Sequence, residues 1–448
     1  MTMDKVRIGA GAGYAGDRWE PALELVERGD IDFLAFECLA ERTIARETQA
    51  MLQNPERGYN PLLVDRIRGV LKASVERGVR IVSNMGAANP RAAAKQVLKV
   101  AEEEGVPGIG VAVLLGDDVR EVLEAMPGLT LIETGEPLES ILPRMASANA
   151  YLGADGIKQA LDTGAEVVMT GRVADSSLFV GPLLHSFGWS YDDYGLLAQA
   201  TLAGHLLECA GQVTGGYFAD PGRKDVADLA RLGFPFADIT SDGQVTVSKA
   251  EGSGGRVDRM TCTEQLLYEL HDPTAYITPD CVLDITDVDF DEVGPDRVRA
   301  RGARANPRTP TYKVSVGYPD GFFGEGQISY GGPNAVARAR LAGEVVRERL
   351  KLRGFLYDEM RIELIGMESL HGPADGRTEP YEVRLRIVGR TDNRRAAEAV
   401  GLETETLLTN GPAGGAGDFR QVKEIYAVQS VLLERRFVDM RVEMVEAA

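Results

Sequence analysis

The stretch Val6-Arg-Ile-Gly-Ala-Gly-Ala-Gly-Tyr-Ala-Gly16 introduces the pattern that decides the fold. A short apolar run leads into glycines, and Pro21–Arg28 then follows with the residue spacing of a helix. The same alternation returns along the chain, with apolar runs at Ile31–Glu37, Val79–Asn84 and Ile109–Leu115 and helical patterns between them. Nearly continuous apolar strands, each followed by a helix, are typical of a parallel sheet that is covered on both faces. We therefore predict an α/β fold with a mostly parallel, open sheet.

The pattern changes near residue 286, which divides the chain into two predicted domains. Residues 1–285 would form a Rossmann-like α/β domain with a ligand crevice at the carboxyl ends of its strands. In residues 286–448, strand-like runs such as Tyr381–Val388 are separated from strong helical patterns at Asn334–Leu350 and Arg394–Leu408. Such segregation predicts a second, smaller α+β domain of the ferredoxin-like kind.

The composition is that of an ordinary globular protein, with 44% hydrophobic and 26% charged residues among 448. The net charge of −19 argues against a nucleic-acid partner, because nucleic-acid binding draws mainly on Lys and Arg contacts to phosphate. No apolar run is long enough for a membrane span, and the N-terminus lacks the apolar run of a signal peptide. The four cysteines have no spacing typical of a zinc site or a disulfide framework. We expect a cytoplasmic protein with no membrane partner and no metal site.

Gly11, Gly13 and Gly16 have the G-x-G-x-x-G spacing of a dinucleotide-binding loop. Glu37 follows where such a fold places the acid that binds the ribose, so the pattern alone would indicate NAD(P). Pro21 argues against it, because a helix that begins within the glycines would carry this proline in its third turn. A dinucleotide site, a loop for a different ligand and a structural turn all stay open. For a ligand loop, the candidates also include Gly9, Asp17 and Arg18.

Polar residues follow the other predicted strands as well, at what would be their carboxyl ends. Glu37 and Cys38 follow one strand, where the carboxylate could act as general base or nucleophile beside the thiol. The alternative is that Glu37 and Glu41 cap and solvate the start of a helix while Cys38 is simply buried. After another strand, Arg172 suits recognition of a carboxylate or phosphate, and Asp175 would orient it or cap the next helix. The remaining candidates at these strand ends are Asn84, Gly86 and Gly171.

Two further signals are weaker. His205 and Glu208 share a helix face, but a second dense set of metal ligands is missing, so we expect a hydrogen-bonded, partly buried histidine. In the second domain, the glycine-rich run 317–334 contains Glu325 and Gln327. We expect these two residues to frame a ligand, although turn formation alone would also explain the glycines.

Several of these segments together resemble the acyclic terpene utilisation (AtuA) family, and the resemblance covers nearly the whole chain. It implies a role in the bacterial breakdown of branched terpenoid acids as CoA thioesters, and hence an acyl-CoA or carboxylic acid substrate. Longer relatives carry an extra C-terminal ferredoxin-like domain with a Ser-Gly-Asp-Lys-Gly signature. This sequence lacks the signature, so a small ferredoxin-like partner subunit would supply it, or the activity would differ. The segments are Ile8–Arg18, Phe36–Glu41, Asn84–Pro90, Thr170–Asp175, Gly324–Tyr330 and Thr409–Gly415.

The leading hypothesis is an enzyme of branched-chain or terpenoid acyl-CoA or carboxylic acid catabolism. It would work by acid–base chemistry, as a hydratase, a lyase or a thioester hydrolase, with Glu37 as base or nucleophile and Arg172 holding an anionic group. Coenzyme A would enter only as part of the substrate. The alternatives are an NAD(P)-dependent oxidoreductase and a non-catalytic acyl-CoA-binding subunit of a carboxylase pathway. Size and acidity suit a homo-oligomer.

Overall fold

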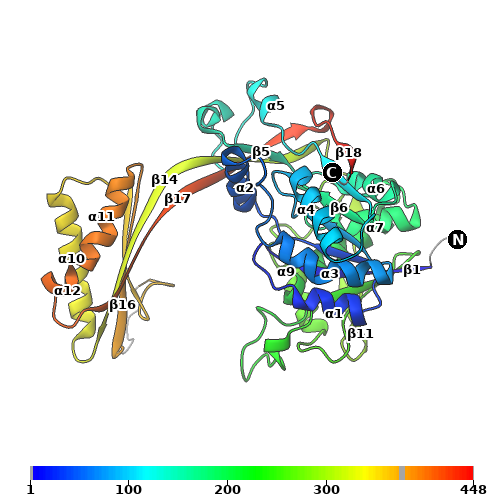
Figure 1. Ribbon diagram of the computed structural model, residues 1–448. Helices are drawn as coiled ribbons and strands as arrows, with labels where there is room; N and C mark the ends of the chain where they lie inside the picture. The colour runs from blue at the N-terminus through cyan, green and yellow to red at the C-terminus, as the bar shows by residue number, and fades with distance from the viewer. Residues whose placement is uncertain (1–3, 373–378, 447–448) are drawn as a thin grey trace. The chain divides into compact units, whose positions relative to one another are not determined.

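A computed structural model describes residues 4–372 and 379–446 of the chain. The contacts between residues divide the chain into two compact units (Figure 1). Unit 1 comprises the described residues of Met1–Gly317 and Val428–Ala448, and unit 2 is Tyr318–Ala427.

Two long strands explain why this division differs from the domain boundary expected at residue 286. Strand β14 (Thr311–Gly331) begins in unit 1 and continues into unit 2, and β17 (Ala416–Glu434) returns the chain to unit 1. Residues 286–317 therefore belong to unit 1, as does the segment that follows β17.

Unit 1 is built on one large mixed sheet, whose described strands follow the order β11-β12-β8-β7-β1-β2-β3-β6-β4-β18. The central strands pair in parallel; they are β1 (Lys5–Ala12), β2 (Phe33–Phe36), β3 (Arg80–Ser83), β6 (Val167–Thr170) and β4 (Val111–Leu115). The flanking strands pair antiparallel; they are β7 (Pro235–Thr240), β8 (Val245–Lys249), β12 (Arg297–Arg301) and β11 (Asp289–Gly294) at one edge and β18 (Arg441–Val445) at the other. The α/β class is confirmed, whereas parallel pairing is confined to the central strands.

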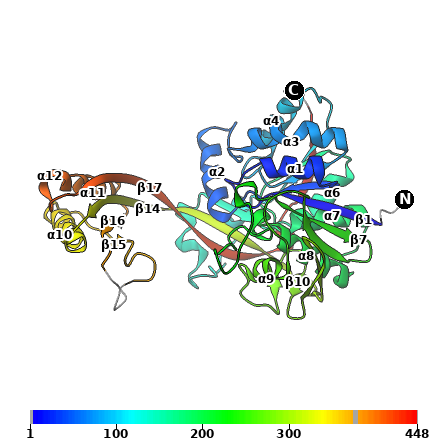
Figure 2. The same cartoon turned by 90° about the horizontal axis from the view of Figure 1, so that it is seen from below.

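The central strands lie between two layers of helices. All side chains of β2 and β4 are buried, as expected for strands that are covered on both faces. In Figure 2 the helices α1, α3 and α4 lie on one side of β1, and α8 lies on the other. Helix α7 packs against both α6 and α8. The helices of unit 1 are α1 (Glu20–Arg28), α2 (Glu41–Gln53), α3 (Leu63–Arg77), α4 (Pro90–Glu103), α5 (Arg120–Glu124), α6 (Ala154–Asp162), α7 (Ser177–Phe187), α8 (Tyr194–Leu207) and α9 (Arg259–Leu267).

The strands outside the large sheet were harder to predict. The sequence predicts a strand at Leu129–Glu133, but the described chain has only an isolated bridge from Thr130 to Pro137 there. The strand in this region is instead β5 (Ser147–Ala150), which pairs antiparallel with β14. A small separate sheet has the order β13 (Arg304–Asn306), β10 (Val282–Asp284) and β9 (Tyr276–Ile277).

Unit 2 has a four-stranded sheet with the order β15-β16-β14-β17. The helices α10 and α11 pack against β16 and against each other. Along β16 the side chains alternate: Val383, Leu385 and Ile387 are buried in the core that these helices share, while Arg384 and Arg386 lie on the opposite face. The elements of unit 2, in chain order after β14, are α10 (Ala335–Leu352), β15 (Glu359–Ile365), β16 (Glu382–Thr391), α11 (Arg394–Glu405), α12 (Leu407–Asn410) and β17.

No helix within the described parts of either unit combines the length and apolar character that a membrane crossing requires.

Candidate functional site

A cavity of about 740 Å³ opens in unit 1 beside the carboxyl ends of the central strands. The loops after β1, β2 and β6 form part of its wall, and the segments after α8 and α9 close it. Its charged lining side chains are Asp17, Arg18, Glu37, Glu41, Asp175, Glu208 and Glu269, and its aromatic ones are Tyr14, Tyr151, Tyr217, Phe234 and Tyr268.

Glu37 lies directly after β2, and its carboxylate is held in place by two hydrogen bonds. The backbone N–H of Leu39 donates to Oε1 over 2.8 Å, and Asn84 Nδ2 donates to the same oxygen over 3.0 Å. Burial raises the pKa of Glu37, while the Arg172 charge and the two donors oppose that rise. Asn84, predicted as a ligand contact, is itself buried and positions Glu37.

Asp175 lies five residues beyond β6 and is paired with Arg172. Arg172 Nη2 lies 2.5 Å from Asp175 Oδ1, and Arg172 Nη1 donates to the backbone oxygen of Leu39. The Asp175 side chain is 38% exposed because it faces the cavity, whereas the Arg172 side chain is 1% exposed. Burial, together with the charges of Glu37 and Glu208, raises the pKa of Asp175 well above its ordinary value although Arg172 opposes this.

Arg172 therefore differs from its predicted role. The sequence assigns it to a substrate carboxylate or phosphate, but its guanidinium lies beneath the cavity wall and stacks 4.2 Å from the centre of the Tyr151 ring. Burial lowers the pKa of Arg172, but the neighbouring Asp175, Tyr151 and Glu37 outweigh it and raise the pKa overall. The buried cation orients Asp175 and stabilises the surrounding carboxylates.

Glu41, the first residue of α2, adds a carboxylate that the sequence indicates only as a candidate helix cap. It accepts a hydrogen bond from Tyr151 Oη, and Lys313 Nζ lies 3.4 Å from its Oε1. Burial favours the protonated form, but the Tyr151 hydrogen bond and the Arg172 charge prevail and lower the pKa of Glu41 to about 2. Glu41 thus stays ionised at the cavity wall.

His205 and Glu208 behave as a hydrogen-bonded pair, as the sequence predicts for the histidine. His205 Nδ1 lies 3.0 Å from Glu208 Oε1, and Nε2 lies 3.0 Å from the backbone oxygen of Leu266. The histidine is 1% exposed, so it is fully rather than partly buried. Sequence reasoning missed that Glu208 lines the same cavity as Glu37 and Asp175. No local motif indicates this, because Glu208 reaches the cavity only through the packing of α8.

Cys38 lies beside Glu37 in the sequence but points away from the cavity. The residue is fully buried, its Sγ lies 3.3 Å from Arg66 Nη1, and its backbone N–H donates to Asn84 Oδ1 over 2.7 Å. Burial raises the pKa of the Cys38 thiol, which disfavours the thiolate that a nucleophilic cysteine needs. These contacts indicate that Cys38 has a structural role beside Glu37.

The glycine-rich segment divides between a strand and a loop. Gly9 and Gly11 lie within β1, and a side chain at Gly11 would meet the Phe36 ring at 2.7 Å. Gly13 lines the cavity and lies against the backbone of Cys209, while Gly16 lies beside Tyr14.

The loop after β1 does not fit the pyrophosphate of a dinucleotide. Helix α1 begins at Glu20, with Pro21 in its first turn as the sequence predicts, so its N-terminus lies seven residues beyond Gly13. The Asp17 carboxylate accepts the backbone N–H of Gly13 over 2.9 Å and that of Arg18 over 2.8 Å. A carboxylate thus already takes N–H groups that a phosphate would need.

Two glycines at strand ends allow segments of backbone to approach closely. A side chain at Gly86 would meet the backbone oxygen of Thr170 at 2.4 Å, and one at Gly171 would meet the carboxylate of Asp117 at 2.5 Å. Asp117 accepts the backbone N–H of Arg172 over 2.9 Å. Both predicted glycines therefore keep neighbouring strand ends together.

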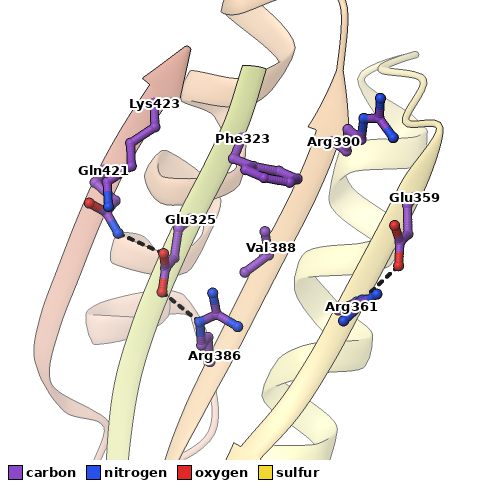
Figure 3. A pocket seen from close by; sticks show the side chains of 9 residues that line it. All are labelled: Phe323, Glu325, Glu359, Arg361, Arg386, Val388, Arg390, Gln421 and Lys423. Carbon is purple, nitrogen blue, oxygen red and sulfur yellow. Dashed lines mark hydrogen bonds and ion pairs between the residues drawn. The ribbon is translucent and has the colours of Figure 1, made fainter. Parts of the chain in front are cut away.

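Glu325 and Gln327 lie on β14 within unit 2 and form a cluster of their own. Figure 3 shows Glu325 between Gln421 and Arg386. Gln327 Nε2 and Arg386 Nε each donate to Glu325 Oε1 over 2.7 Å, and Gln421 Nε2 donates to Oε2 over 2.7 Å. Burial favours protonation of Glu325, but these three hydrogen bonds prevail and lower its pKa. A small cavity of about 290 Å³ adjoins the cluster, with Phe323 and Val388 in its wall.

Among the described residues, no three His, Cys, Asp or Glu side chains are placed to share a metal ion. The cavity in unit 1 is therefore characterised by carboxylates and aromatic rings.

Comparison with known proteins supplies the family. Searches of curated proteins and of solved structures each found no match. A family model described as acyclic terpene utilisation family protein AtuA matches residues 6–444, which confirms the resemblance noted from the motifs. Since this match spans nearly the whole sequence, the protein belongs to the acyclic terpene utilisation (AtuA) family.

Proposed function

We propose that this protein is an enzyme of acyclic terpenoid breakdown that performs acid–base chemistry in the cavity of unit 1. The observation that carries the proposal is that Glu37 and Asp175, from separate strand ends, line one cavity in unlike surroundings. Two carboxyl groups whose environments separate their protonation are a common arrangement for an acid and a base. Family membership supports the terpenoid part of the proposal.

Glu37 is assigned as the general base. Burial raises the pKa of Glu37, but Arg172 and two N–H donors oppose that rise and favour its ionised form. Asp175 is assigned as the general acid, because burial and the charges of Glu37, Glu208 and Glu41 all raise its pKa. A proton would then pass from Asp175 to the substrate, and Glu37 would take a proton from the substrate or from water. Hydration, lyase cleavage and thioester hydrolysis each use such a pair.

The finer details extend the sequence-based hypotheses. The substrate would be a branched acyl-CoA or the corresponding carboxylic acid, with coenzyme A as part of the substrate. Unit 1 would be a Rossmann-like domain with added antiparallel strands. The order β-α-β-β-α-β, with the short helix α12 added before the last strand, supports a ferredoxin-like topology for unit 2. We further propose a cytoplasmic homo-oligomer, which a small ferredoxin-like partner subunit could complete.

Turnover of a panel of branched acyl-CoAs and free terpenoid acids tests the proposal. We expect Glu37→Gln and Asp175→Asn each to lower kcat by about 10²–10⁴, because each removes one proton-transfer group. Glu102→Gln is the matched control, since Glu102 is exposed on α4 away from the cavity. Full turnover by Glu37→Gln would refute the assignment of the base. Binding of acyl-CoA without turnover of any substrate would favour the non-catalytic subunit.

The oxidoreductase alternative gains no support from the loop after β1, because Asp17 takes its N–H groups. A nicotinamide-dependent reaction of the purified protein would nevertheless overturn the acid–base proposal.

A further inference from the structure

The cavity of unit 1 carries far more negative than positive charge. Six carboxylate side chains line it, whereas Arg18 is the lining cation among the described residues. Arg172 offsets part of this charge from beneath the wall, where its Nη2 pairs with Asp175 and its Nη1 donates to Leu39, but the lining carboxylates remain in excess. The substrate's own charge is therefore a strong constraint on what binds here.

Glu208 supplies an independent sign of a missing partner. Its Oε1 is engaged by His205, but its buried Oε2 accepts no hydrogen bond. The residue is 7% exposed and lines the cavity. A buried carboxylate oxygen without a donor is costly, so a ligand that brings a cation or an N–H or O–H group would relieve it.

Aromatic side chains complete the surroundings. Tyr14, Tyr217 and Tyr268 line the cavity together with Tyr151 and Phe234. Their rings provide apolar walls, and aromatic faces attract cations. Apolar walls beside carboxylates that outnumber the lining cations suit an apolar ligand that carries positive charge.

Glu208 and Glu37 are 7% and 8% exposed and line the cavity together with Asp175, and we call these three carboxylates its inner end. We propose that this inner end is a subsite for positive charge on a branched apolar ligand. The subsite rests on the proposed function in taking this cavity as the substrate site, and the reaction described below also uses its assignment of Asp175 as acid and Glu37 as base. It further implies that the phosphates of an acyl-CoA, or a free carboxylate, stay outside the inner end, because like charges repel there.

The subsite also indicates a class of reaction. This class is the hydration of a branched alkene through a carbocation intermediate. Asp175 gives its proton to one alkene carbon, and the π electrons form the new C–H bond. The other carbon becomes positively charged, and water adds to it through a lone pair. Glu37 takes the proton that this water loses, and proton exchange with solvent then returns Glu37 and Asp175 to their starting forms, so alkene and water give an alcohol with no oxidant or reductant. An enolate intermediate would instead place negative charge among the carboxylates.

Ligand binding tests the subsite without any need for turnover. Calorimetry would compare an acyclic monoterpene amine, the matching alcohol and the matching carboxylate at neutral pH. We expect the amine to bind at least about tenfold more tightly than the carboxylate, with the alcohol between them. Equal or tighter binding of the carboxylate would overturn the proposal.

Three variants test whether the cavity carboxylates cause the preference for the amine. Glu208→Gln should reduce the ratio of amine to carboxylate affinity by about tenfold, because it removes the charge at the inner end. Glu269→Gln lies on an exposed part of the wall and guards against a folding defect at Glu208; it should reduce the ratio by a smaller factor. Glu102→Gln should leave the ratio unchanged. A ratio that survives both cavity variants would contradict the inference.

The binding measurement and the turnover measurement can fail independently, so the subsite and the proposed function are tested separately. A strong preference for the amine together with full turnover by Glu37→Gln would keep the charge subsite and remove the assigned base. Loss of turnover in Glu37→Gln together with a preference for the carboxylate would keep the assigned base and remove the charge subsite.

Discussion

Asp117 shows at the scale of one residue how close packing fixes a strand end. Its Oδ2 accepts the backbone N–H of Arg172 and Asn149 Nδ2, each over 2.9 Å. Burial and the charge of Asp118 raise the pKa of Asp117 to about 6, although these donors oppose the rise. The ordinary value is 3.8, so the folded protein holds this proton over a window in which the unfolded chain has lost it.

This raised pKa makes stability depend on pH. Stability from the protonated Asp117 is present at acid pH and is lost as the pH rises from about 4 to about 6. Asp117→Asn should therefore increase the free energy of unfolding at pH 8 by up to about 3 kcal/mol and give no such gain at pH 4. Urea unfolding at the two pH values measures this difference. An equal effect at both would show that packing, not ionisation, dominates.

The candidate site shows which residues a sequence can and cannot indicate. Glu37 directly follows β2 and Asp175 lies in the loop after β6, so their convergence follows from the parallel order of those strands. Cys38 lies one residue from Glu37, but the contact of its thiol with Arg66 depends on packing between distant segments. Glu208 is likewise invisible in sequence, because α8 brings it to the cavity from outside the β–α alternation.

At the scale of elements, β14 shows why a glycine-rich segment need not be a loop. The sequence predicts two short strands, at Tyr312–Val316 and Gln327–Tyr330, with turns between them. The structure has one strand of 21 residues. A side chain at Gly324 would meet the backbone oxygen of Ala397 on α11, and one at Gly326 would meet Thr404 Oγ1. These glycines let the helix lie against the strand, a requirement that local sequence patterns do not reveal.

A pair of alanine substitutions tests this packing. Gly324→Ala should destabilise unit 2 by about 1–3 kcal/mol, because the new methyl group overpacks the contact with α11. Gly331→Ala is the matched control on the same strand, since no atom lies within 4 Å of its added carbon. Hydrogen exchange of the α11 and β16 amides reports on unit 2 within the intact chain. Comparable exchange in both variants would count against the close packing.

At the scale of the whole molecule, the net charge of −19 is a source of self-repulsion. Raising NaCl from roughly 0.01 M to 0.15 M shortens the range of this repulsion from about 30 Å to about 8 Å. We expect Tm at pH 8 to rise by a few degrees, about 2–4 °C for each kcal/mol gained. The rise should shrink near pH 4, where carboxylates become protonated, and KCl should act like NaCl. A Tm that falls or stays constant at pH 8 would refute this expectation.

The path of the chain through β14 and β17 has a consequence for protein engineering. The two strands are neighbours in one sheet, and they lie side by side in both views (Figures 1 and 2). Unit 2 is thus an insertion whose entry and exit are adjacent strands, and a single deletion closed by a short hairpin turn would excise it. Every residue that lines the 740 Å³ cavity would remain in the truncated protein, because all of them belong to unit 1.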